Sequence, residues 1–340
     1  MADPGGDLDG NGPAMRMLGD DAATSAWLTL TRSLREPVPA VGLPAADELA
    51  PVLLDLAVPH EDIDLLIGLA KRVDASPELS ELLTLCVRGI MAQMGQIGGL
   101  VPLPSFANLP SPLDRYFSVL VFVSALPAAR AFHQARGIPE DVSRRTFEDL
   151  GRNIAVHRKR HGTGGLHAPG WQMLHFTGAL FDLGRLQFER ARLGETTSAG
   201  MQAAGFACEP GDATLSVHIP DFSGPMSPEA CDASFARASA FFARHFPEER
   251  FTTAVCHSWL MDEQLGEYLP ASSNIMRFQH RFRLAYQNDG DHNHGPLGFV
   301  FGRTIEDLDD LPRDTTLQRA VVDHIRAGRQ WHGGTGWLEL

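Results

Sequence analysis

The sequence predicts an α+β protein in which a helical N-terminal domain precedes a mixed α/β domain. Two observations support this: apolar residues recur with a helical period from residue 23 to about 178, and short strand-like runs alternate with helices beyond it. A length of 340 residues also exceeds that of a usual single core. We therefore expect domains at 23–178 and 179–340, after an acidic, glycine-rich and disordered tail at 1–22.

The first domain is expected to contain only helices and loops. Two of its helices have clear start signals, because Ser76 and Ser111 are each followed by a proline suited to the first helical turn. The apolar spacing predicts helices at 23–36, 45–57, 60–74, 77–94, 112–136, 139–160 and 168–178.

The second domain is expected to be a mixed sheet with helices on its faces. Its first strand is the clearest, since Leu180, Leu183, Leu186 and Phe188 are spaced for burial. One helix should follow Ser227, another should cover 314–327, and 192–212 should be a connector with little structure. Strands are expected at 179–191, 213–219, 251–259, 279–287, 296–302 and 336–340.

Charge and composition argue against several classes of protein. A net charge of −13 disfavours a general binder of nucleic acids or of anionic membranes, which needs clustered cations. The most apolar run, Phe117 to Leu126, is shorter than the ~20 residues that cross a bilayer, and the acidic N-terminus is unlike a signal peptide. The four scattered cysteines indicate reduced, buried thiols. We expect a cytoplasmic protein with no membrane or nucleic-acid partner.

Three runs in the second domain carry a family resemblance. They are Gly184-Arg-Leu-Gln-Phe-Glu189, Val217-His-Ile-Pro220 with Gly224-Pro-Met-Ser-Pro-Glu229, and Cys256-His-Ser-Trp-Leu-Met-Asp262 with Ser272-Ser-Asn-Ile-Met-Arg-Phe278. Together they resemble the bacterial two-domain acyltransferases that have a helical N-terminal domain and a GNAT-like C-terminal domain.

The resemblance implies both a fold feature and a reaction. Two strands of a GNAT-type sheet splay apart to admit an acyl-CoA, and a base removes the proton of an amine that enters from the opposite side. The implied function is transfer of an acyl group from a thioester donor, acyl-CoA, to the amine of a small molecule. An acyl carrier protein is the other donor considered. The alternative is a non-catalytic GNAT-like module that binds a ligand or a partner protein.

The phosphate-binding loop of ordinary GNAT enzymes is not evident. That loop reads [Arg/Gln]-x-x-Gly-x-[Gly/Ala] and opens a helix after a strand. The stretch Gln202 to Ala207 fits the pattern but lies in the expected connector before a strand, so we reject it. The basic run Arg158, Lys159 and Arg160 is the remaining candidate for the CoA phosphates. Its other interpretation is a helix C-terminus whose cations suit the helix dipole.

Three residues are candidates for catalysis. His218 ends a strand, where a neutral imidazole can deprotonate an amine or a water molecule; the alternative is a half-buried histidine bonded to a neighbouring carbonyl. Glu189 ends the first strand and can act as a base or fix the imidazole of His218, unless it is a solvated strand-end charge. Ser258, or Cys256 on the same side, needs an adjacent base such as His218 to transfer an acyl group.

Three further residues are candidates for binding substrate. His257 and Trp259 alternate with Cys256 and Ser258 along the strand, so they should face its other side. Trp259 is either a pocket wall or an aromatic core residue, and Asn274 is either a polar donor or a helix cap. No metal is expected, because the histidine pairs have no evident third ligand.

Overall fold

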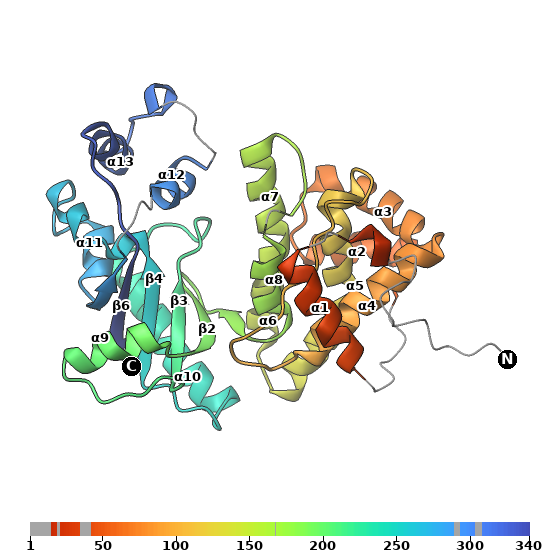
Figure 1. Cartoon of the computed structure of the whole chain (residues 1–340), viewed down its shortest axis with the longest axis horizontal. Helices are drawn as coiled ribbons and strands as arrows, with labels where there is room; N and C mark the ends of the chain where they lie inside the picture. Colours follow the sequence, from red (N-terminus) through yellow and green to blue (C-terminus); the bar gives the residue numbers. More distant parts are fainter. Residues whose placement is uncertain (1–14, 19–20, 35–41, 167, 289–292, 303–307) are drawn as a thin grey trace. The chain divides into compact units, whose positions relative to one another are not determined.

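The computed structural model describes residues 15–18, 21–34, 42–166, 168–288, 293–302 and 308–340. The chain divides into two compact units, Met1–Ala179 and Leu180–Leu340 (Figure 1). The first unit is helical and the second contains a six-stranded mixed sheet with helices. The predicted fold class is therefore confirmed.

The helical unit is built around one apolar core that every long helix contributes to. Ser76 caps its helix as predicted, since its side chain accepts a hydrogen bond from the amide of Leu79, whereas Ser111 contributes no such cap. The α-helices of this unit are α1 (Ala22–Ser33), α2 (Ala46–Asp55), α3 (His60–Asp74), α4 (Pro77–Ala92), α5 (Leu113–Ala135), α6 (Glu140–Phe147), α7 (Asp149–His161) and α8 (Pro169–Phe176).

The single helix predicted at 139–160 is in fact two helices, α6 and α7. The break falls beside Asp149, whose carboxylate turns inward to accept hydrogen bonds from Trp171 Nε1 and Gln172 Nε2, both at 2.9 Å. Both donors belong to α8, so the break depends on a tertiary contact that a local pattern does not contain.

The apolar run at 117–126 lies within α5, which is much longer than that run. Among the described residues, α5 is the one helix that is long and apolar enough to cross a membrane by length and composition. Yet 72% of its most apolar stretch is buried inside the structure, and core helices of soluble proteins have the same character.

The second unit contains a mixed sheet in the order β1-β2-β3-β4-β6-β5. The β3–β4 pair is parallel, and the other four neighbouring pairs are antiparallel. The strands are β1 (Leu180–Asp182), β2 (Gln187–Arg192), β3 (Ala213–His218), β4 (Thr253–Ser258), β5 (Arg283–Gln287) and β6 (Gly334–Glu339).

The first predicted strand, 179–191, is a hairpin of β1 and β2. Phe181 pairs with Phe188 across the turn, and Asp182 accepts a hydrogen bond from the amide of Gly184. Gly184 has φ +117°, a conformation that side chains other than hydrogen rarely allow. The prediction missed the turn because the four apolar residues are all buried, as expected, on both sides of it.

Two other predictions in this unit were wrong. The strand predicted at 296–302 is a helix, α12 (His294–Phe301), in which Pro296 lies in the first turn, where proline is tolerated. The expected connector at 192–212 contains helix α9 (Glu195–Ala203), whose Met201 packs against Val255 and Trp337 of the sheet.

Helices α9 and α10 (Pro228–His245) pack on opposite faces of the sheet (Figure 1). Ser227 caps α10 as predicted, and Phe235 of this helix contacts Phe188 edge-on, with ring centroids 5.4 Å apart. The remaining helices are α11 (Asn274–Gln279) and α13 (Thr316–Arg326), with 3-10 turns at Met15–Met17, Trp259–Met261, Glu263–Glu267 and Leu308–Asp310. The four cysteines are free and buried, as expected.

Candidate active site

The parallel strands β3 and β4 separate halfway along their length. Each has six residues, but the pairing between them is confined to Leu215 with Ala254 and Ser216 with Val255. Each strand keeps its six-residue pairing with its other neighbour, β2 or β6. The splayed pair of strands implied by the family resemblance is therefore present in the α/β unit.

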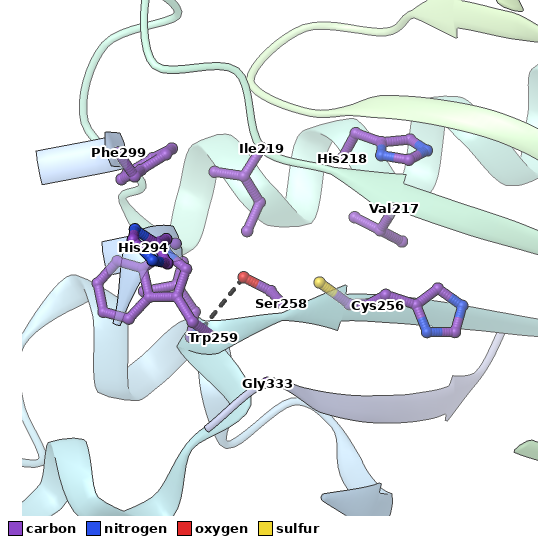
Figure 2. A pocket seen from close by; sticks show the side chains of 12 residues that line it. Val217, His218, Ile219, Cys256, Ser258, Trp259, His294, Phe299 and Gly333 are labelled. Carbon is purple, nitrogen blue, oxygen red and sulfur yellow. Dashed lines mark hydrogen bonds between the residues drawn. The ribbon is translucent and has the colours of Figure 1, made fainter. Parts of the chain in front are cut away.

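A cavity of about 520 Å³ opens where the two strands diverge (Figure 2). Its size is within the usual range for small-molecule sites. The side chains of Ile219, Phe299 and Trp259 surround one end of it, and those of Val217 and Cys256 lie toward the other (Figure 2). The remaining lining residues are His218, His257, Ser258, Leu260, His294, Gly295 and Gly333.

His218 and Glu189 form a hydrogen-bonded pair beside this cavity. The β2–β3 register pairs Gln187 with His218 and Glu189 with Ser216, so the two side chains project from the same face on adjacent strands. His218 Nε2 lies 2.8 Å from Glu189 Oε2, and the two side chains are 26% and 18% exposed.

This pairing determines which nitrogen of His218 is basic. A carboxylate only accepts hydrogen bonds, so Nε2 of His218 carries the hydrogen that Glu189 accepts. Nδ1 then carries the lone pair of the neutral imidazole and can take a proton from a substrate ammonium. Glu189 orients the ring and stabilises the imidazolium that results, as in other carboxylate–histidine pairs.

His257 projects from the same face of the sheet on the next strand. Its Nδ1 lies 2.7 Å from Oγ1 of Thr335, its register partner on β6. His257 is an exposed residue that lines the cavity, and the protein atoms around the cavity replace part of the water around its ring. This desolvation lowers the pKa of His257. Protonation of the nearby His218 would lower it further, and the carboxylate of Glu189 opposes the shift. His257 is therefore neutral at neutral pH.

Thr335 fixes the tautomer of this neutral ring. Its side chain is 1% exposed, and Nδ1 of His257 is the acceptor that the described residues offer its hydroxyl hydrogen. A buried hydroxyl left without an acceptor is costly. We therefore assign the hydroxyl as donor to Nδ1, which places the ring hydrogen on Nε2.

Cys256 and Ser258 project from the opposite face to His218. The pairing of Leu215 with Ala254 puts both side chains on the Val217 face. Ser258 Oγ accepts a hydrogen bond from the amide of Leu260 at 3.1 Å and so caps the 3-10 turn Trp259–Met261. Burial raises the pKa of the Cys256 thiol to about 12. His218 and Glu189 are thus hydrogen bonded to each other, whereas the side chain of Ser258 projects from the other face of the sheet.

The other two binding candidates differ in their positions. Strand β4 ends at Ser258, so the expected alternation does not reach Trp259, which instead lines the cavity with 9% of its surface exposed. Asn274 is exposed at the first position of α11 and does not line the cavity. The cap of that helix is Ser273, whose Oγ accepts from the amide of Met276.

The basic run Arg158 to Arg160 lies in the helical unit, at the C-terminal end of α7. The helix ends at Gly162, whose φ of +68° is typical of a C-terminal glycine. Arg158 pairs with Asp62 and lies 3.7 Å from Glu61, while Lys159 is exposed. The position of these cations at a helix C-terminus, where they suit the helix dipole, is sufficient to explain the run. Binding of the CoA phosphates by Arg158, Lys159 and Arg160 stays a prediction.

The rejected stretch at 202–207 begins in the last turn of α9 and continues past it. Its position at a helix C-terminus is unsuited to an anion. Within the described ranges, no group of three or more histidine, cysteine, aspartate or glutamate side chains is arranged to hold a metal ion.

Four further residues line or support the site and were not predicted: Thr335, Ile219, Gly295 and Phe299. Ile219 directly follows His218, so its position past the end of a strand was a usable signal. The misassigned strand at 296–302 concealed Phe299, and Gly295 lies just before that strand in the first turn of the unpredicted helix α12. Thr335 comes from the last strand, for which local sequence offers no pairing register.

Comparison with known protein families supports the assignment of both units. Residues 180–338 match the family model of the GNAT-like C-terminal domain, and residues 47–178 match that of the N-acyltransferase N-terminal domain. No curated protein sequence matches the chain.

Solved structures are similar over nearly the whole chain. An acyltransferase in complex with decanoyl-CoA and teicoplanin is 36% identical, covers 94% of this chain and 96% of its own, and gives a TM-score of 0.81. A mutant acyltransferase in complex with octanoyl-CoA is also 36% identical, with 96% and 98% covered and a TM-score of 0.83. An acyltransferase in complex with decanoyl-CoA is 34% identical, with 98% and 99% covered and a TM-score of 0.85.

These matches define the class of protein as an acyltransferase with a GNAT-like domain. The chain belongs to the family of two-domain acyltransferases that join an N-acyltransferase N-terminal domain to a GNAT-like C-terminal domain. Membership of this family confirms the predictions of GNAT-like acyl transfer and of acyl-CoA as co-substrate.

Proposed function

We propose that this protein transfers an acyl group from acyl-CoA to the amine of a small-molecule acceptor at the split between β3 and β4. The observation that carries the proposal is the His218–Glu189 pair, 2.8 Å apart, beside a cavity at the point where the strands separate. The relatives bound to decanoyl-CoA, to octanoyl-CoA and to teicoplanin support a thioester donor and a small-molecule acceptor.

The proposed reaction needs one base and one leaving group. His218 Nδ1 takes a proton from the acceptor ammonium, and the resulting amine attacks the thioester carbonyl. A carbon–nitrogen bond forms and the carbon–sulfur bond breaks. The nitrogen gives its second proton to the departing CoA thiolate, and the proton held by His218 is released to water. Glu189 keeps the ring oriented through these steps, and His257 Nε2 supplies a neutral hydrogen-bond donor beside the split.

Coenzyme A is the donor that we favour over an acyl carrier protein, because the similar structures contain CoA or its thioesters. Arg158, Lys159 and Arg160 remain our candidates for its phosphates. The absence from the sequence of an ordinary GNAT phosphate-binding motif favours the alternative, a non-catalytic GNAT-like module that binds a ligand or a partner protein.

A transfer assay separates these two functions. The purified full chain is incubated with octanoyl-CoA and a panel of small amines, including amino sugars and teicoplanin-type acceptors, while thiol release and product mass are followed. Acceptor-dependent thiol release with a matching N-acyl product supports the proposal. Tight binding of octanoyl-CoA with no product from any acceptor would instead support the binding module.

A further inference from the structure

Helix α12 is apolar on every side except at its first residue. Its sequence is His-Gly-Pro-Leu-Gly-Phe-Val-Phe, in which His294 is the single polar side chain. Pro296 is its one buried residue, and Phe299 is 37% exposed. An apolar helix covered this little is unusual in a folded domain, where contiguous apolar surface commonly marks a binding site.

One side of this helix forms a wall of the cavity. His294, Gly295 and Phe299 line it, and the Phe299 ring faces the Trp259 ring edge-on with centroids 6.1 Å apart. Phe299, Ile219 and Trp259 lie around the same end of the cavity in Figure 2. A methyl group added at Gly295 would lie 3.7 Å from Trp259 Cδ1, which is an ordinary contact distance. The missing side chain of Gly295 therefore leaves room for about one methyl group against Trp259, and a larger side chain there would enter the cavity.

Trp259, against which α12 packs, is held by a network of aromatic and polar contacts. Trp259 meets the ring of Trp331 at 6.3 Å, and Trp331, which is fully buried, stacks on His324 at 4.0 Å. His324 Nδ1 is hydrogen bonded to the hydroxyl of Tyr268 at 3.0 Å, and its Nε2 lies 3.1 Å from the carbonyl oxygen of Gln330. Trp259 thus has a fixed position, against which a ligand chain can pack.

We infer that α12 is the outer wall of a channel for the acyl chain, and that Gly295 and Phe299 determine how long a chain the enzyme accepts. This inference rests on the proposed function and specifies its donor. An unbranched alkyl chain fits the apolar lining, and each methylene withdrawn from water against it is worth about fourfold in affinity, the equivalent of ~0.8 kcal/mol. Short donors such as acetyl-CoA gain nothing from this end of the cavity.

The test measures kcat/KM and Kd for acyl-CoAs of two to twelve carbons with four forms of the full chain. Gly295→Leu should lower kcat/KM for octanoyl- and decanoyl-CoA by roughly tenfold or more, while changing acetyl-CoA by less than about twofold. Phe299→Ala should move the optimum toward longer chains. Gly298→Leu is the matched control, because it makes the same change on the same helix away from the cavity.

The outcomes distinguish this inference from the proposed function. An unchanged chain-length profile in Gly295→Leu, with wild-type activity present, would overturn the channel and leave acyl transfer intact. Chain-length-dependent Kd values that shift in Gly295→Leu, with no turnover of any donor, would keep the channel and overturn the transferase. Chain-length-independent Kd values in the wild type would also overturn the channel. Circular dichroism of each variant checks that it is folded.

Discussion

Glu189 Oε2 accepts a hydrogen bond from His218 Nε2 over 2.8 Å, between adjacent strands and beside the point where β3 leaves β4. The carboxylate thereby selects the ring tautomer whose Nδ1 is basic. Histidine with an orienting carboxylate is a recurrent solution for moving protons near neutral pH. In this protein the pair stands where two strands separate and a thioester has room to enter.

Glu189→Gln is expected to lower kcat by roughly 10–10²-fold with less change in KM, because an amide does not stabilise the imidazolium. Steady-state kinetics with octanoyl-CoA measure this effect. Glu263→Gln, at an exposed residue of the same unit, is the matched control. In the double variant with His218→Ala, the two losses should not add, since both residues act through one proton transfer. Additive losses would show that Glu189 acts independently of His218.

The ring nitrogens of His257 should show the Nε2–H tautomer at neutral pH. Nitrogen-15 NMR of selectively labelled histidine reports this directly, and a hydrogen on Nδ1 would contradict the assignment of Thr335 as donor. Thr335→Val keeps the side-chain shape but removes the hydroxyl, so it should mix the two tautomers and lower kcat/KM by about tenfold. Thr252→Val, at an exposed residue before β4, should leave the His257 spectrum unchanged.

Ser258→Ala is expected to retain activity within about threefold and to lose about 0.5–2 kcal/mol of stability. The reason is that Ser258 Oγ caps a 3-10 turn and lies on the opposite face to His218. Chemical denaturation measures the stability, and intact-mass spectrometry tests for a covalent intermediate. An acyl adduct on Ser258, or on the buried Cys256, would contradict direct transfer to the acceptor.

Acid should destabilise the helical unit through His133. This side chain is 1% exposed, its Nδ1 lies 2.9 Å from Ser143 Oγ, and its ring stacks on Phe147 at 4.7 Å. Burial lowers the pKa of His133 to about 3. The unfolded chain binds a proton near pH 6.5 and the folded chain does not, so the free energy of unfolding falls as pH drops from 6.5 toward 3.

This loss of unfolding free energy can be measured by comparing the wild type with a His133 variant at two pH values. At pH 5 the His133 contribution amounts to about 2 kcal/mol relative to pH 7. Replacing the residue by His133→Asn has its own structural cost at both pH values, and this cost cancels when the two unfolding curves are compared. The variant should therefore lose about 2 kcal/mol less than the wild type between pH 7 and pH 5. Equal losses would contradict this account, because they would show that the pKa of His133 is the same in the folded and the unfolded chain.

Local patterns in the sequence were sufficient for the class of fold and for choosing His218 and Glu189, which the structure shows to be hydrogen bonded, as candidates. The strand end at His218 is visible from alternation and from the proline that follows Ile219. Glu189, which we expected at the end of its strand, is instead the third residue of β2, and the β2–β3 register brings it beside His218. The helical spacing of apolar residues and the N-terminal capping residues also predicted α10 and α13. Both signals depend only on residues near each other in the sequence.

The parts that were not predicted depend on contacts between distant segments. The turn at Gly184 is hidden because residues on both sides of it are buried, and α12 contains the aromatic and β-branched residues that usually mark a strand. The pairing of His257 with Thr335 follows from the register of β4 with β6, which joins segments 78 residues apart. Sequence alone does not specify such a register.

The measurement that tests the central claim most directly is the turnover of His218→Ala with octanoyl-CoA and an amine that the wild type acylates. The account predicts that kcat falls by roughly 10²–10⁴-fold, the usual worth of a general base, while the Kd for octanoyl-CoA changes little. His280→Ala, at an exposed histidine of the same unit, should behave as the wild type. Unchanged turnover in folded His218→Ala would contradict the assignment of His218 as the base.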